Sequence, residues 1–256
     1  MEKSYRIFLC LFFYFPVVFA GNMKLYYERP AEYFEEALVI GNGTMGETLY
    51  GGVKKDKISF NDITLWTGEP ESENSSPDAF NVIPEIRALL DNEDYQGADK
   101  AQYKVQGHYS ENYQPLGTLT IEYLDDTAGI SDYHRWLDIG NATARTQYLK
   151  DGKLFTSDYF ASAPDSVIVI RLKSENKEGI HASLSFDSPL PHSSQVADNE
   201  ISVEGYAAYH SFPVYYKAED KHRYDPERGI HFKTLVRVLS VDGSVKDRYS
   251  DSRIEI

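Results

Sequence analysis

The sequence predicts a mainly β fold, an antiparallel β-sandwich with a short inserted helical hairpin. Short segments of strand composition, separated by tight turns, occupy most of the chain after residue 116. The 20 tyrosines suit half-buried sheet faces, where the ring packs and the hydroxyl stays in water. Only residues 81–105 have the apolar spacing of helices, so βαβ units and a parallel sheet are disfavoured.

Residues 1–20 have the features of a secretory signal peptide. Lys3 and Arg6 belong to a basic start, and the apolar run Ile7–Phe19 has 13 residues, too few to span a bilayer. We expect the mature domain to comprise residues 21–256 and to be exported to a bacterial periplasm, the cell surface or the extracellular space. It should have no membrane attachment after cleavage. An uncleaved anchor is the less favoured alternative.

Charge and cysteine content exclude several functions. The formal net charge is −14 and no basic stripe is present, so binding to nucleic acid or anionic lipid is disfavoured. Neutral ligands such as sugars are compatible with this charge. The single cysteine, Cys10, lies in the signal peptide, so the mature chain has no disulfide and must be stabilised by its core.

The first part of the mature chain contains strand candidates and a glycine-rich corner. Residues 24–27 and most of residues 45–66 have strand composition. Gly41, Gly43 and Gly46 match the G-x-G-x-x-G spacing of a phosphate loop, but strand-like residues follow where a helix is needed. We therefore interpret the glycines as a strand-to-strand corner that uses positive φ angles.

Residues 81–105 are predicted to form two short helices that are inserted into the β-rich chain. Pro84 fits the first turn of the first helix, where no backbone donor is lost. Asp94 is the expected cap of the second helix, with Ala98 and Ala101 facing inward.

From Leu116 onward the chain is predicted to be β-structure. Asp151-Gly152 predicts a type I′ hairpin turn between two strands. The apolar run Ser166–Ile170 predicts a central strand that is covered on both faces. Residues 251–256 resemble a strand that is just beginning, with no partner after it, so we expect the domain to be truncated at its C-terminal end.

No residue set is predicted to be catalytic, to bind a metal or to hold a cofactor. The seven histidines are scattered, whereas a zinc site needs three or four convergent ligands. Adjacent acidic pairs are numerous, but a glycosidase needs two carboxyl groups about 5 to 10 Å apart across a bound sugar. Nothing in the sequence singles out such a pair.

Two aromatic and polar loops contain the candidate contact residues. Aromatic rings can pack on the apolar C–H faces of pyranoses, while polar neighbours bind hydroxyl groups. The favoured alternative is that the rings wedge each loop onto its own domain or a neighbouring one. The substrate-rim or domain-interface candidates are Trp66, Thr67, Gly68, Tyr113 and Gln114.

Several motifs follow one another in a specific order. They are K-L-Y-Y-E-R-P-A at residues 24–31, E-A-L-V-I-G-N-G at residues 36–43, N-D-I-T-L-W-T-G at residues 61–68, I-P-E-I-R-A-L-L at residues 83–90 and Y-Q-P-L-G at residues 113–117. This order is similar to that of the amino-terminal domain of glycoside hydrolase family 95, the α-L-fucosidase and α-L-galactosidase family. Val39, Glu47 and Thr118 depart from the family pattern, which has Pro, Ala and Asp there.

The resemblance implies an antiparallel β-super-sandwich that precedes an (α/α)6 barrel. It also implies inverting hydrolysis whose acid and asparagine-assisted base belong to the barrel, so no catalytic residue is carried over to this chain. The resulting hypothesis is a non-catalytic N-terminal domain of an exported α-L-fucosidase, inactive alone. Its partners would be the barrel and, through the full-length enzyme, a fucosylated glycan. The alternatives are a stand-alone secreted carbohydrate-binding β-sandwich and a structural surface protein.

Overall fold

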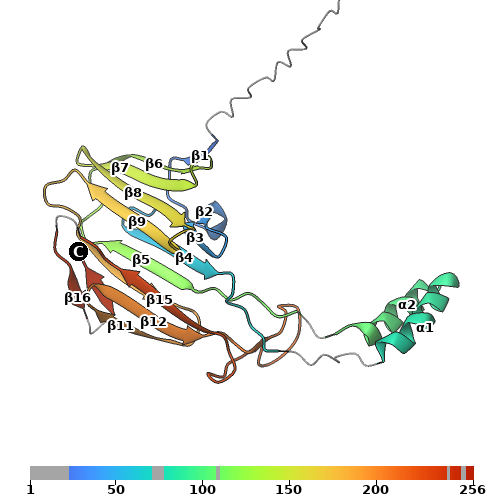
Figure 1. Ribbon diagram of the computed structural model, residues 1–256. Coiled ribbons are helices and arrows are strands. Elements are labelled where there is room, and N and C mark those ends of the chain that lie inside the picture. The colour runs from blue at the N-terminus through green and yellow to red at the C-terminus, as the bar shows by residue number, and fades with distance from the viewer. Residues whose placement is uncertain (1–22, 71–77, 108–109, 241–242, 249–251) are drawn as a thin grey trace, which may run out of the picture.

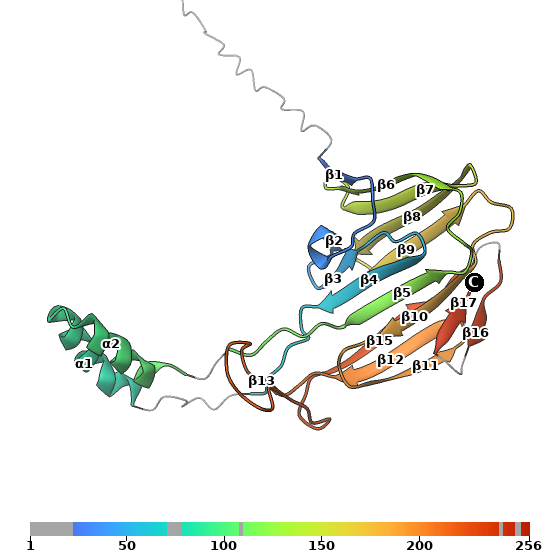
Figure 2. The same cartoon turned by 180° about the vertical axis from the view of Figure 1, so that it is seen from behind.

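The computed structural model describes residues 23–70, 78–107, 110–240, 243–248 and 252–256. Its strands form a layered sandwich in which every strand pair is antiparallel (Figures 1 and 2). This arrangement, with one inserted pair of helices, confirms the predicted mainly β fold. The predicted signal peptide lies outside the described residues.

A seven-stranded sheet, called here the large sheet, forms one layer of the sandwich. Its strands, in order across the sheet, are β16 (Lys246–Arg248), β17 (Arg253–Glu255), β10 (Ala182–Asp187), β5 (Gly117–Tyr123), β4 (Lys55–Asp62), β3 (Met45–Leu49) and β2 (Leu38–Gly41).

Two smaller sheets form the other layer. The structure also contains a two-stranded sheet and a short 3₁₀ helix. The five-stranded sheet contains β1 (Lys24–Tyr27), β6 (Ile130–Asp138), β7 (Thr143–Lys150), β8 (Lys153–Ser162) and β9 (Val167–Ser174). The three-stranded sheet contains β11 (His192–Ala197), β12 (Glu200–Tyr206) and β15 (His231–Arg237). The remaining elements are β13 (His210–Ser211), β14 (His222–Arg223) and η1 (Phe34–Glu36).

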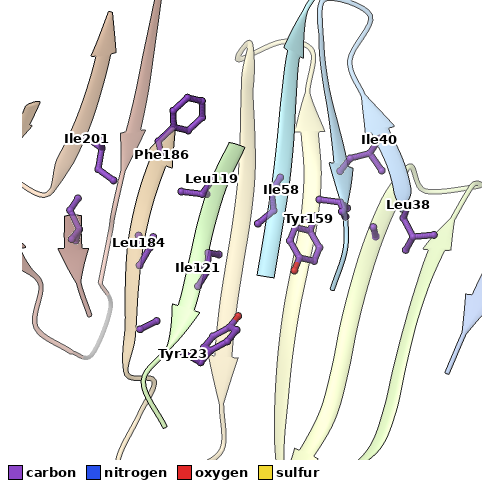
Figure 3. Packing of buried hydrophobic residues seen from close by; sticks show 14 of the residues in the cluster. Leu38, Ile40, Ile58, Leu119, Ile121, Tyr123, Tyr159, Leu184, Phe186 and Ile201 are labelled. Carbon is purple, nitrogen blue, oxygen red and sulfur yellow. The ribbon is translucent and has the colours of Figure 1, made fainter. Parts of the chain in front are cut away.

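One face of the large sheet carries the core. Along β5, buried and half-buried residues alternate, so Leu119, Ile121 and Tyr123 point to the same face. The same cluster of buried hydrophobic side chains includes Tyr159 of the five-stranded sheet and Ile201 of the three-stranded sheet (Figure 3). Both smaller sheets therefore cover the same face of the large sheet, and they share one core.

A buried carboxylate joins the two layers. Asp56 on β4 is 1% exposed, and its Oδ2 accepts a hydrogen bond of 2.7 Å from the Tyr159 hydroxyl on β8. Its Oδ1 accepts from the Gly52 amide at 2.9 Å, while the Tyr133 hydroxyl donates to the Gly51 carbonyl at 2.6 Å. Gly51 has a φ of +71°, which favours glycine. The turn between β3 and β4 is thus fixed to the opposite sheet.

A second buried acid in the same core has no such partners. Glu47 on β3 is 2% exposed, and neither carboxylate oxygen has a hydrogen-bond partner among the described residues. It lies between Ile40 and Phe60 on the neighbouring strands. Burial, together with the charge of Asp56, raises the pKa of Glu47 to about 8. Burial also raises the pKa of Asp56 to about 6, against the lowering effect of its hydrogen bonds.

The inserted helices form a hairpin, α1 (Ala79–Asp91) and α2 (Tyr95–Gln102), followed by η2 (Tyr103–Val105). Asp94 caps α2 by accepting from the Gly97 amide at 2.9 Å, and Ala98 and Ala101 are buried, as predicted. The placement of Pro84 in the first turn was wrong. Because α1 already begins at Ala79, Pro84 is its sixth residue and lies inside the helix. Among the described residues, no helix is long and apolar enough to cross a membrane.

The prediction of the hairpin turn is confirmed, whereas one prediction of strand position was wrong. Asp151 and Gly152 have φ values of 50° and 74°, as a type I′ turn requires. The apolar strand β9 is an edge of the five-stranded sheet and not a central strand, because apolar composition does not encode order within a sheet. The strand expected at residues 251–256 is present as β17. Its partners, β10 and β16, both precede it in the chain, and Ile254 is 0% exposed.

The unpartnered acid predicts how stability depends on pH. Because the folded-state pKa of Glu47 is raised, its contribution is fully present below its ordinary pKa and is lost as pH rises towards 8. Asp56 adds to this fall up to about pH 6. We expect the free energy of unfolding, measured by urea denaturation, to decrease by on the order of 2–4 kcal/mol between pH 5 and pH 8. Glu47→Gln should make this dependence much shallower; an unchanged slope in the variant would contradict the assignment.

Candidate functional site

The candidate contact residues meet where β4 leaves the large sheet and β5 enters it. Trp66 and Tyr113 pair in an antiparallel bridge. On either side of the bridge, the Thr67 amide donates to the Asn112 carbonyl at 2.8 Å and the Gln114 amide donates to the Leu65 carbonyl at 2.9 Å. Residues 65–67 and 112–114 therefore continue the β4–β5 ladder beyond the sheet. The structure brings together the two loops that the sequence singled out.

The two rings are exposed, while their polar neighbours are buried. Trp66 is 45% and Tyr113 49% exposed, whereas Thr67 and Gln114 are 4% and 6% exposed. The indole Nε1 donates to the Ile63 carbonyl at 3.1 Å, which fixes the orientation of the ring. Beneath the loops, Leu65 packs in a small core with Leu190, Ala207, Leu116 and Phe232. Among the five candidate residues, the two rings are therefore the ones that are open to contacts outside the domain.

Glu111 is the hub that holds the loops together. Its Oε2 accepts from the Thr67 hydroxyl and, at 3.1 Å, from the Ser211 amide. Its Oε1 lies 2.7 Å from the His210 Nδ1. The Glu111 side chain also fills the space beside Gly68, where an added Cβ would lie 2.9 Å from its Cγ. Gly68 has a φ of +116°, so backbone geometry and space both favour glycine there.

A third segment, residues 207–229, forms one side of the site. The Asn112 side chain donates to the Ser211 carbonyl at 3.0 Å, and the Ser211 hydroxyl lies 2.9 Å from the His222 Nδ1. Next to them, the Phe212 ring packs edge-on against His210 at 4.4 Å between ring centroids. These contacts join β13 and β14 to the loop that carries Tyr113.

An ion pair between Arg228 and Glu69 lies on the same side of the site. The Arg228 Nε donates to the Glu69 Oε2 at 2.9 Å, and its guanidinium stacks on the Tyr209 ring at 3.7 Å. The Arg228 hydrogen bond holds the pKa of Glu69 below its ordinary value. Both charged groups are partly exposed, so the pair positions the segment more than it stabilises the fold.

The polar cluster braces the two loops. Ser211 is 1% exposed, and its hydroxyl lies 2.9 Å from the His222 Nδ1. Both Glu111 oxygens are used within the fold. Within residues 23–256, where described, no group of three His, Cys, Asp or Glu side chains could hold a metal ion. Trp66 and Tyr113 are the exposed members of the candidate set.

Sequence reasoning missed the residues that make the brace. Glu111 stands in one of the loops that were singled out, but nothing in its local context marks it as a hub. His210 and His222 are two of the seven histidines scattered along the sequence, and no motif there includes Ser211. The contacts of His210 and Ser211 with Glu111 and Asn112 span about 100 residues of sequence, and no local pattern encodes such contacts.

Comparison with known proteins identifies the family of the chain. The family model described as "Glycosyl hydrolase family 65, N-terminal domain" matches residues 25–256, nearly the whole described chain. The chain belongs to this family. The match covers both loops of the candidate site and the inserted hairpin.

The curated relatives of this glycosyl hydrolase N-terminal domain have α-fucosidase names. "Alpha-L-fucosidase 2" of Arabidopsis thaliana is 31% identical over 87% of this chain and 27% of the relative. "Probable alpha-fucosidase A" of Aspergillus niger is 29% identical over 62% of this chain and 21% of the relative. The chain is thus homologous to the N-terminal region of α-fucosidases, as the motifs predicted, and spans about a quarter of the length of these relatives.

The role of Glu111 can be tested by its removal. Glu111→Ala leaves the Thr67 hydroxyl and the Ser211 amide without their acceptor, and we expect a loss of about 2 kcal/mol in the free energy of unfolding. Hydrogen exchange should accelerate at Ser211. Glu219→Ala, which removes an exposed carboxylate from the neighbouring segment, is the control and should change neither quantity. Wild-type stability in Glu111→Ala would contradict the hub.

Proposed function

We propose that this chain is the non-catalytic N-terminal domain of an exported α-L-fucosidase, which hydrolyses fucosyl linkages in glycans with inversion. The observation that carries this proposal is the 31% identity to "Alpha-L-fucosidase 2" across 87% of the chain, including both loops of the site. The apolar, cleavable start of the sequence supports export. The catalytic acid and base belong to a barrel domain outside this chain.

The positions of three acids in this chain support the assignment of the catalytic acid and base to the barrel. Inverting hydrolysis needs one carboxyl group on each side of the scissile bond, with room for a water molecule. Glu47 and Asp56, whose pKa values are raised, lie inside the core, where no sugar reaches them. Glu111 uses both oxygens to hold the loops. The domain contributes shape and contacts, and the barrel supplies the proton transfer.

The exposed ring pair would contribute to the rim of the sugar site. Trp66 and Tyr113 are neighbours across the bridge and are held from below by hydrogen-bonded backbone. A ring that is fixed in this way loses little conformational entropy when a pyranose packs on it. The proposed ligand is a fucosylated glycan that is bound jointly with the barrel.

The test uses this chain alone and a fusion in which it replaces the matched region of the Arabidopsis relative. We expect the chain alone to release no fucose from an aryl α-L-fucoside above the rate of a heat-denatured sample. The fusion should hydrolyse the substrate. Trp66→Ala and Tyr113→Ala should raise its KM for a fucosylated oligosaccharide by about tenfold, with a smaller change in kcat. Hydrolysis by the isolated chain would overturn the assignment of the catalytic groups to the barrel.

A stand-alone carbohydrate-binding domain is the second candidate, and the exposed ring pair is the observation that favours it. It predicts that the isolated chain binds fucosylated glycans with a Kd below about 1 mM, measured by titration calorimetry. Trp66→Ala should abolish this binding. The matched control is Phe160→Ala, because Phe160 is 40% exposed and lies on β8 of the five-stranded sheet, in neither loop of the site. The fucosidase-domain proposal expects little binding by the isolated chain.

A further inference from the structure

The inserted hairpin has almost no core of its own. In α1 no residue is fully buried, and in α2 only Ala98 and Ala101 are. Isolated helices of 13 and 8 residues are marginal in water, and most helical stability in proteins comes from tertiary packing. The packing of α1 against α2 and η2, with an ion pair of 3.7 Å between Glu85 and Lys104, supplies only part of what such helices need.

An apolar surface on α1 is left uncovered. Phe80, Ile83 and Leu90, together called the hairpin stripe, are 83%, 39% and 47% exposed. Their spacing of three and seven residues places them on one side of the helix, next to the side that packs on α2. An amphipathic helix of a globular protein normally buries such a surface.

The hairpin stripe lies at the same end of the molecule as the candidate site. The hairpin is inserted between the two loops that carry Trp66 and Tyr113, and both views show it beyond the end of the sheets (Figures 1 and 2). A partner that contacts the ring pair can therefore contact the hairpin as well.

Charge favours a different protein surface over a second copy of this chain. Residues 78–105 contain six acidic and three basic side chains, and the whole chain has a formal net charge of −14. Two hairpins that met through their stripes would bring like charges together, which is unfavourable. A suitable partner has an apolar patch with a basic rim. The curated relatives offer a source for it, since about three quarters of the Arabidopsis protein lies outside its match to this chain.

We propose that the hairpin stripe docks on the part of the fucosidase that lies outside this domain, and that this contact fixes the domain on the barrel. This inference rests on the proposed function. Docking orders the hairpin and seats the ring pair, which lies at the same end of the molecule, at the sugar site. In the chain alone the hairpin has no partner, and its helices open locally more often than the core strands do.

The first experiment uses the chain alone. We expect amide hydrogens of residues 79–105 to exchange at least about 100-fold faster than those of β5, and the double variant Phe80→Asp, Ile83→Asp to leave Tm unchanged. A clear fall of Tm in the variant would overturn the proposal, because the stripe would then pack on this domain. A dimer that the variant converts to a monomer would also overturn it, because the occupant would be a second copy.

The second experiment compares the chain alone with the fusion to the remainder of the Arabidopsis relative and with a mixture of the two separate parts. We expect exchange of residues 79–105 to slow by about tenfold or more in at least one format, and the double variant to abolish this protection. Leu239→Asp, at an apolar residue that is 83% exposed and remote from the hairpin, should retain it. No added protection in either format overturns docking. Protection without fucosidase activity would leave docking standing and contradict the proposed function.

Discussion

The pairing of β4 with β5 is the constraint on which the rest of the structure depends. The two strands come from segments about 55 residues apart, and they pair over Lys55–Phe60 and Gly117–Glu122 at the centre of the large sheet. On the core side, the pairing aligns Ile58 with Leu119. Beyond the sheet, it continues into the Trp66–Tyr113 bridge, which fixes the register of the candidate site. The helical hairpin is the excursion that the chain makes between these two strands.

The two buried acids, Asp56 and Glu47, differ in whether their carboxylates have hydrogen-bond partners. Asp56 accepts from a tyrosine and from backbone amides, so its charged form is partly compensated and it connects the two layers. Glu47 has no described partner, so burial favours its neutral form. Glu47 is the part of the core that ties stability to pH.

What the sequence could predict follows from the range of the interactions involved. The Asp151-Gly152 turn and the Asp94 cap depend on a few adjacent residues, and both are confirmed. The position of β9 at an edge depends on contacts between distant segments, and the prediction of a central strand was wrong. The pairing of β17 with β10 depends on contacts of the same kind, and no local pattern predicts it. The same limit applies to the site. The aromatic loops were visible as local composition, but the Glu111 contact with His210 was not.

The candidate site and the hairpin differ in how they are held, and this difference bears on how the domain could work. The ring pair rests on a network in which each buried polar group of Glu111 and Thr67 has a partner, an arrangement that favours a single geometry. The hairpin has few internal contacts and an uncovered apolar stripe, so its ordering depends on what binds it. Because the ring pair is rigid and the hairpin is adaptable, the hairpin can adjust to a partner without moving the rings. The hairpin is inserted between β4 and β5, and it lies with the ring pair at one end of the sandwich, where a single partner surface can engage them together (Figures 1 and 2).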